Sequence, residues 1–200
     1  MAEARYDRAV EAGETETTTS AAVLRAMRPT DVPEVMAIER LSFSFGWPHT
    51  AFERELSGNA MARYIVLEAP AAGVSGLAGF GGIWLMVDEA HIVTVAVVPE
   101  QRGRGFGRLL VHGLVTLARQ NAMDVATLEC RVSNTEARAL YADYGFYEVG
   151  LRKRYYADNG EDAVIMTTES LTSPAYVRRL ERLEDKLRTL LPAWECMLPG

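Results

Sequence analysis

In this chain a run of β-branched residues passes through a glycine-rich stretch into an apolar run. Residues 91–98 read HIVTVAVV, residues 99–107 read PEQRGRGFG, and Leu109 and Leu110 open the apolar run. This order predicts a strand, a loop and then a helix over about 105–121. The first N–H groups of a helix have no partner within it and bind anions, and glycine lets a ligand reach the backbone. We therefore expect an anion-binding loop at residues 103–108.

Two common phosphate-binding patterns do not fit this stretch. The pattern G-x-G-x-x-G would need a glycine at Arg108 if it started at Gly103, and at Leu110 if it started at Gly105. The pattern G-x-x-x-x-G-K-[ST] fails because no Lys-Ser or Lys-Thr pair follows. The order R-G-x-G-x-G is therefore a motif of another kind.

Strand and helix patterns alternate along most of the chain and predict an α/β fold. The expected strands are residues 23–28, 62–68, 76–86, 90–98, 124–132, 146–157 and 162–170. The expected helices begin at Thr30 or Asp31, around Phe52, at about 105 and at Asn134. Gly145 follows the last of these helices at the position that ends a helix in the left-handed conformation.

The two ends of the chain differ from this central part, residues 22–171. Residues 1–21 are polar and acidic, and we expect a mobile tail because they bury too little surface to offset their ordering entropy. In the extension at 172–200, Ser173 and Pro174 begin a helix that runs to Pro192. The helix either packs on its own domain or forms a homodimer or partner contact. Its apolar positions are Tyr176, Leu180, Leu183, Leu187 and Leu190.

Composition excludes several classes of protein. A formal net charge of −6 argues against a general nucleic-acid binder. There is no apolar run of roughly 20 residues, and the N-terminus does not resemble a signal peptide. Cys130 and Cys196 lack the spacing of a disulfide scaffold or zinc site, and His91 and His112 have no metal-ligand spacing with a carboxylate. We expect a cytoplasmic protein without a metal, a membrane or a nucleic-acid partner.

Residues 102–107 resemble the acetyl-CoA motif R/Q-x-x-G-x-G/A of the GNAT family of N-acetyltransferases. SNTEARALYADYGF, residues 133–146, resembles the family's second signature. IERLSFSFGWP, LECRVSN and RYYADNGEDAVIM resemble its RimI branch, which acetylates protein N-termini, including the N-terminal alanine of a ribosomal protein. The resemblance covers about residues 23–170. It implies the GNAT fold, a mixed central sheet of about seven strands flanked by about four helices, here with a C-terminal amphipathic helix added.

The resemblance also implies how acetyl-CoA, the co-substrate, is bound. The pantothenate arm is expected to pair like an extra strand with the backbone of Val95, Ala96 and Val97. Asn134 is implied as a cofactor contact, and its place before a helix independently predicts an N-cap. Arg104 and Arg108 either add charged contacts to phosphate or are solvated surface arginines. The pyrophosphate is expected on the loop formed by Gly103, Arg104, Gly105, Phe106, Gly107 and Arg108.

Glu129 is the strongest candidate for a catalytic residue. In DVATLECRV, strand alternation puts Thr127, Glu129 and Arg131 on one face. A carboxylate in a central strand needs a reason to be there. It either forms a salt bridge with Arg131 or another cation, or it takes part in catalysis. The substrate amine must lose a proton before it attacks a thioester, and the resemblance implies that Glu129 is the general base, acting through water.

Tyr141 is implied as the acid that protonates the leaving thiolate, with a core aromatic residue as the alternative. Cys130 invites a covalent acetyl-enzyme, but alternation points it away from Glu129 and leaves it without an activating base. We therefore expect direct transfer of acetyl in a ternary complex.

Substrate recognition is predicted from aromatic residues. Phe45, Gly46 and Trp47 resemble the branch's substrate loop, and Tyr155 and Tyr156 resemble its facing β-hairpin. These residues would form a narrow slot for a chain terminus. The expected function is N-terminal acetylation of a polypeptide, with a ribosomal protein as the partner. The alternatives are an acetyltransferase for lysine or a small amine, and a non-catalytic module that binds acetyl-CoA.

Overall fold

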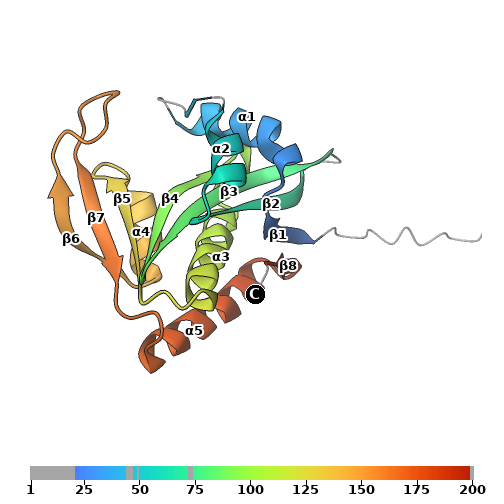
Figure 1. The fold of residues 1–200 in the computed structure, drawn as a ribbon. Helices are drawn as coiled ribbons and strands as arrows, with labels where there is room; N and C mark the ends of the chain where they lie inside the picture. The colour runs from blue at the N-terminus through green and yellow to red at the C-terminus, as the bar shows by residue number, and fades with distance from the viewer. Residues whose placement is uncertain (1–20, 44–46, 49, 72–73, 199–200) are drawn as a thin grey trace, which may run out of the picture.

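The computed structural model describes residues 21–43, 47–48, 50–71 and 74–198, so all but the last residue of the expected tail at 1–21 lies outside the described residues. Figure 1 shows a central sheet with helices on both faces. In chain order the elements are β1 (Ala22–Ala26), α1 (Val32–Ser42), α2 (Ala51–Gly58), β2 (Ala62–Ala71), β3 (Val74–Met86), β4 (Glu89–Val97), α3 (Phe106–Gln120), β5 (Val125–Arg131), α4 (Thr135–Asp143), β6 (Phe146–Arg152), β7 (Ala163–Thr168), α5 (Pro174–Leu190) and β8 (Trp194–Met197).

One mixed sheet holds all eight strands, in the order β6-β7-β5-β4-β3-β2-β1-β8. Its two faces have separate cores. Residues of α3 and α5 pack on one face, which we call face A, and residues of α1 and α2 pack on the other, which we call face B. The predicted α/β architecture with a mixed sheet is therefore confirmed, with one strand more than expected.

The parallel strands β4 and β5 pair for only part of their length. Their register runs from Glu89 opposite Val125 to Ile92 opposite Leu128 and goes no further among the described residues. Figure 1 shows the two strands side by side at one end and apart at the other. Val93 is an extra residue in β4, because Gly82 pairs with Thr94 and Ile83 pairs with Ile92. Such bulges bend a strand and are frequent next to active sites.

The C-terminal extension belongs to the same core. Tyr176, Leu180, Leu183 and Leu187 are buried in the core of face A, and the Tyr176 hydroxyl donates to the carbonyl of Tyr144 at 2.7 Å. Of the two alternatives for this helix, packing within the chain is the one observed. Of the five apolar positions only Leu190 stays exposed, at 52%, and a homodimer through this helix stays a prediction.

Strand β8 was not expected from the sequence. It pairs in parallel with β1, with Ala22 opposite Trp194 and Arg25 opposite Met197. Four residues give too short a period to identify a strand, and this strand depends on a partner at the other end of the chain. By pairing with β1 it covers an edge that β1 would otherwise expose.

The hairpin near the end also differs from the prediction. Strand β6 ends at Arg152, whereas the sequence predicted a strand to residue 157. Arg154 has φ of 53° and its N–H donates to Asp162 Oδ1 at 2.7 Å, so the backbone turns there. Tyr155 and Tyr156 consequently lie in the loop between β6 and β7. The helix end at Gly145 is confirmed, with φ of 85°.

None of the helices in the described ranges is long and apolar enough to cross a membrane.

Candidate functional site

The candidate site lies where β4 and β5 separate. Along β5, Leu128 and Cys130 are buried in the core of face A, so Glu129 between them points toward face B. Tyr141 of α4 packs against the core of face A. The two predicted catalytic residues therefore approach the gap between the strands from opposite faces of the sheet.

Glu129 has two basic partners, His91 and Arg152, and Arg131 is not one of them. Its side chain is 7% exposed, with Oε2 at 3.0 Å from His91 Nε2 and Oε1 at 3.1 Å from Arg152. Arg131 instead pairs with Asp158 at 2.8 Å and Glu161 at 3.1 Å. The alternative that a cation holds Glu129 is thus observed, but the cation is Arg152 at the exposed end of β6, and His91 of the neighbouring strand β4 is a second contact.

His91 is a site residue that sequence analysis missed. The Thr127 hydroxyl donates to Glu89 Oε1 at 2.6 Å, so its oxygen accepts from His91 Nδ1 at 2.9 Å. This network requires the proton on Nδ1, because Thr127 has a single hydroxyl proton. His91 Nε2 and Glu129 Oε2 then need a shared proton at their 3.0 Å separation. The only sequence signal for this chain of groups was that Glu89 and His91 share one strand face.

Tyr141 and Cys130 keep their protons at neutral pH. Burial raises the pKa of Tyr141 above its ordinary range, and the nearby Cys130 and Tyr156 add to the effect. Burial also raises the pKa of the Cys130 thiol to about 11. A neutral Tyr141 can act as a proton donor. A neutral Cys130 that points away from Glu129 is not activated for acetyl transfer, as the alternation predicted.

The glycine loop has the geometry of an anion site. Gly103 and Gly105 have φ of 73° and 90°, a region that residues with a side chain rarely adopt. The first hydrogen bond of α3 runs from Leu109 N–H to the Gly105 carbonyl. The N–H groups of Phe106 and Gly107, like that of Arg108, donate to no acceptor among the described residues. Three donors at a helix N-terminus can bind a negatively charged group.

Gly105 has a second role that the sequence did not indicate. A Cβ atom at this position would lie 2.6 Å from Leu190 Cδ2, at the end of α5. A side chain at this position would therefore displace Leu190 as well as strain the backbone.

The predicted cofactor residues around the loop are placed as follows. Arg104 donates to Gln101 Oε1 at 2.5 Å and lies over the Phe106 ring, and Arg108 pairs with Asp143 at 2.6 Å. Asn134 caps α4, because its Oδ1 accepts from the Ala137 N–H at 3.1 Å. Neither arginine is purely solvated, and both still have exposed surface.

The backbone of β4 beyond the bulge has one edge toward β3 and one toward the gap. Val95, Ala96 and Val97 pair with β3 on one side, and β5 does not reach them on the other. Ala96 is 4% exposed and the two valines pack on the core of face A, so the side chains are structural, as expected. What remains for a ligand here is the main chain on the open edge.

The predicted substrate loop is only partly described. Phe45 and Gly46 lie outside the described residues. Trp47 stacks on Phe52 with ring centroids 5.3 Å apart, and the backbone N–H of Trp47 donates to Glu39 Oε1 at 2.8 Å. Glu39 of α1 is 1% exposed. It is a second residue near the site that sequence analysis missed.

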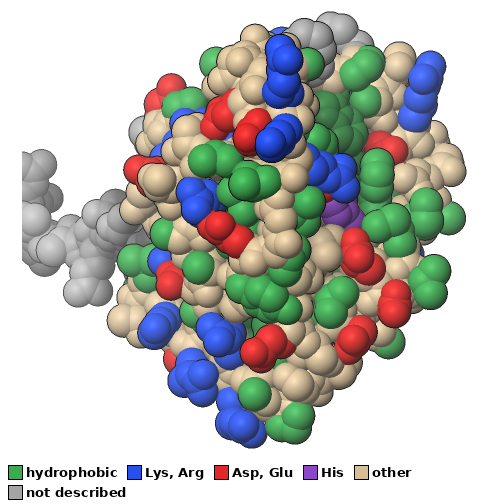
Figure 2. Space-filling model, turned by 90° about the vertical axis from the view of Figure 1, so that its left-hand side faces the viewer, with side chains coloured by type: hydrophobic (Ala, Val, Ile, Leu, Met, Phe, Trp, Pro, Cys, Tyr) green, Lys and Arg blue, Asp and Glu red, His purple; other side chains and the backbone are tan. Residues whose placement is uncertain are grey.

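In the loop between β6 and β7, the rings of Tyr155 and Tyr156 meet edge to face with centroids 5.2 Å apart. The Arg131 guanidinium lies over the Tyr156 ring, 3.8 Å from its centroid. Burial raises the pKa of Tyr156 to about 12, and the neighbouring Cys130 contributes. Figure 2 looks onto the side that carries β5, β6 and β7 and shows a hollow where hydrophobic side chains meet acidic and basic ones. Trp47 and the two tyrosines are thus anchored by contacts of their own.

Comparison with known proteins gives a consistent result. Residues 32–146 match the model of the acetyltransferase (GNAT) family. A Bacillus subtilis protein provisionally named a ribosomal protein bS18-alanine N-acetyltransferase is 43% identical over 145 residues, which are 72% of this chain and 93% of that protein. The Salmonella typhimurium enzyme of that name is 35% identical, over 68% of this chain and 90% of its own length.

Solved structures agree with the sequence matches. The ribosomal-protein-S18-alanine N-acetyltransferase from Escherichia coli has a TM-score of 0.66 and 29% identity, covering 74% of this chain and 93% of its own. Ard1 from Thermoplasma volcanium has a TM-score of 0.65 and 26% identity, covering 74% of this chain and 97% of its own. The segment after residue 146, including α5, lies outside the family match.

Proposed function

The chain belongs to the acetyltransferase (GNAT) family and is an N-acetyltransferase that uses acetyl-CoA, and we propose that its acceptor is the N-terminal amine of a polypeptide. The names of its relatives support an N-terminal alanine of a ribosomal protein as the substrate. Such a substrate would put the enzyme in the cytoplasm. The observation that carries the proposal is the buried Glu129 carboxylate at the gap, linked to His91 at 3.0 Å.

Acetyl-CoA would enter from face A. The free N–H groups at the start of α3 suit its diphosphate, and the open edge of β4 at Val95, Ala96 and Val97 suits the amides of its pantetheine arm. The thioester would then reach the gap, where backbone N–H groups of β4 can polarise its carbonyl. Arg104 would add positive charge near the diphosphate.

The amine would enter from face B, where Trp47 and the tyrosines Tyr155 and Tyr156 lie. An α-ammonium has a pKa near 8, against about 10.4 for lysine, so a terminal amine needs less help to lose its proton. Glu129, directly or through water, accepts this proton, and Arg152 can leave the carboxylate because its side chain is 54% exposed. The neutral amine attacks the carbonyl carbon, forming the C–N bond of the amide.

A path of hydrogen bonds can prepare Glu129 before it accepts the amine proton. With the shared proton on His91 Nε2, His91 can pass its Nδ1 proton to Thr127 as Thr127 passes its own to Glu89. The net effect is one proton moved from the His91–Glu129 pair to Glu89, which leaves a neutral His91 beside an anionic Glu129. Glu129 then takes the amine proton and later releases it to water, and we propose His91 as a catalytic partner of Glu129.

Loss of coenzyme A completes the reaction. As the C–S bond breaks, the sulfur takes the electron pair, and Tyr141 donates its hydroxyl proton to the thiolate. The nitrogen loses its second proton to water as the amide forms, and Tyr141 regains a proton from water. The raised pKa of Tyr141 keeps that proton available at neutral pH. A thiolate with a pKa near 8.5 is already a fair leaving group, so this contribution is modest.

The experiment that tests the proposal is mass spectrometry of peptides incubated with the full chain and acetyl-CoA. One peptide begins with alanine, and the matched peptide has a blocked N-terminus and one internal lysine. Acetylation of the α-amine of the first peptide alone is expected. Preferential acetylation of the lysine would replace the proposed acceptor, and binding of acetyl-CoA without turnover on any amine would mean a non-catalytic module.

A further inference from the structure

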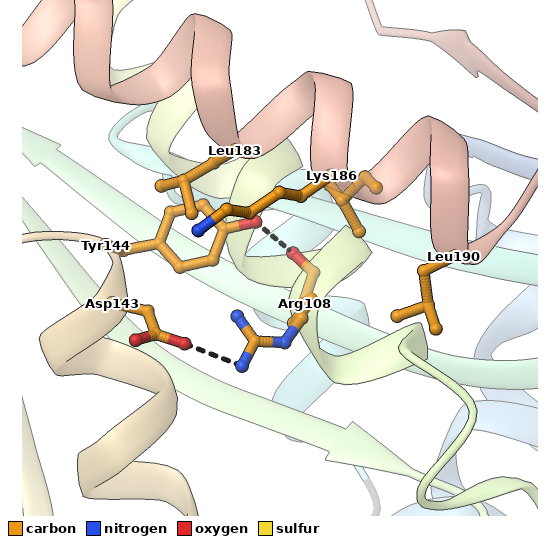
Figure 3. A pocket seen from close by; sticks show the side chains of 7 residues that line it. Arg108, Asp143, Tyr144, Leu183, Lys186 and Leu190 are labelled. Carbon is orange, nitrogen blue, oxygen red and sulfur yellow. Dashed lines mark hydrogen bonds and ion pairs between the residues drawn. The ribbon is translucent and has the colours of Figure 1, made fainter.

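A small pocket of about 170 Å³ lies between the start of α3, the end of α4 and the helix α5. Figure 3 shows the side chains that surround it. Three of them are ionic, and the leucines of α5 give it an apolar wall. Its lining includes Arg108, Asp143, Tyr144, Leu183, Lys186 and Leu190.

The pocket is continuous with the glycine loop. Leu190 lines the pocket and also lies against Gly105, where a Cβ would be 2.6 Å away. Arg108 lines it from the first turn of α3, the turn whose N–H groups are free among the described residues. A ligand whose diphosphate binds those N–H groups could therefore extend directly into the pocket.

The charges in the pocket favour an anion. Arg108 pairs with Asp143 at 2.6 Å, and both side chains are partly exposed, so this pair contributes little net charge. Lys186 forms no ion pair with any residue that the structure describes. In Figure 3 its side chain extends from α5 across the pocket toward Tyr144. The pocket thus has one uncompensated positive charge beside an apolar wall.

We propose that this pocket binds the 3′-phosphoadenosine end of acetyl-CoA, with Lys186 pairing with the 3′-phosphate and the leucines Leu183 and Leu190 contacting the adenine. The inference rests on the proposed function. With the pantetheine arm on β4 and the diphosphate on the loop, the adenosine must leave the loop on the side away from Glu129. Of the groups in coenzyme A, this end combines a dianion with a flat aromatic ring, which suit the positive charge and the apolar wall of the pocket.

The proposal gives α5 a role that the family match cannot supply, because the match ends at residue 146. Lys186 belongs to the C-terminal extension, and Leu190 of the same helix braces the loop at Gly105. Cofactor recognition would therefore be shared between the GNAT core and a helix that lies outside the family match.

The test is calorimetric titration of the full chain with acetyl-CoA and with 3′-dephospho-acetyl-CoA at one fixed ionic strength. For Lys186→Gln we expect affinity for acetyl-CoA to fall on the order of tenfold, the size of a charge-assisted contact, with affinity for the dephospho compound unchanged. Arg178→Gln, the same charge change on an exposed part of α5 two turns away, should change neither affinity.

Three outcomes would overturn the proposal. In the first, Lys186→Gln binds acetyl-CoA as the wild type does. In the second, it loses affinity equally for both ligands, which would place the effect away from the 3′-phosphate. In the third, Arg178→Gln shows the same selective loss, which would indicate long-range charge. Failure of the wild-type chain to bind either ligand would instead overturn the proposed function, so the two results are distinguishable.

Discussion

His91 Nε2 lies 3.0 Å from Glu129 Oε2, on two parallel strands that stop pairing one residue beyond the histidine. The carboxylate is therefore joined to a second ionisable group and, through Thr127, to Glu89 at a more exposed position. A lone buried carboxylate would have to exchange its proton with the substrate or with water alone. This pair has a defined route for the proton.

We expect Glu129→Gln to lower kcat/KM by about 10²–10⁴, the usual contribution of a general base, because the amide cannot accept the proton. Affinity for acetyl-CoA should stay nearly unchanged, since Glu129 points toward face B. Steady-state kinetics and calorimetry measure the two effects. Cys130→Ala is the matched neighbour and should retain activity, because Cys130 points the other way. Equal activity of Glu129→Gln and wild type would remove Glu129 from the mechanism.

His91→Gln and Thr127→Val interrupt the proton path at two points while leaving Glu129 in place. Both should reduce kcat by about tenfold or more and change the shape of the pH–rate profile, with little change in affinity for acetyl-CoA. Thr127→Ser keeps a hydroxyl and should restore most of the rate. If Thr127→Val had the profile of the wild type, the path from His91 to Glu89 would be wrong even if His91 itself mattered.

Tyr141→Phe should slow turnover by roughly tenfold without abolishing it, because coenzyme A is a fair leaving group without a proton donor. The ring remains, so the edge-to-face contact with Phe146 at 5.8 Å should persist and the melting temperature should change little. Rates measured with rapid mixing separate this step from product release. A wild-type rate for the variant would leave Tyr141 with a packing role only.

Gly105→Ala should reduce the free energy of unfolding by about 1–3 kcal/mol for its positive φ, and further for the overlap with Leu190. Gly103→Ala is the control, since its φ is also positive but its Cβ would meet nothing within 4 Å. Adding Leu190→Ala should recover part of the loss at Gly105 and none at Gly103. Denaturant melts measure all four variants. Gly105→Val should in addition lose affinity for acetyl-CoA, and retained affinity would argue against the phosphate assignment.

His112 makes stability depend on pH. It is 5% exposed, and burial lowers its pKa below the usual value near 6.5. The unfolded chain therefore binds this proton more readily than the folded one, so its contribution to stability is present above about pH 6.5 and decreases as the pH falls below that value. In His112→Phe the melting temperature should fall less between about pH 7 and pH 5.5. An unchanged slope would show that other groups dominate in this range.

Local patterns in the sequence predicted most elements correctly. The β-branched run, the glycine stretch and the alternation around Glu129 were each encoded within about ten residues, and their structures follow from strand and helix periods. The cap at Asn134 and the left-handed Gly145 followed from the same local chemistry. Short or interrupted elements were less predictable. The turn at Arg154 ends β6 earlier than expected, and β8 has only four residues.

The sequence by itself determined that an anion-binding helix start follows a strand, and that Glu129 lies on the opposite strand face from Cys130. Only the tertiary structure decided that His91 faces Glu129, that Arg131 does not, and that Leu190 and Lys186 approach the glycine loop. The reason is that a side chain's direction is set by its own backbone, whereas the register of parallel strands and the position of a distant helix are set by packing between segments far apart in the chain.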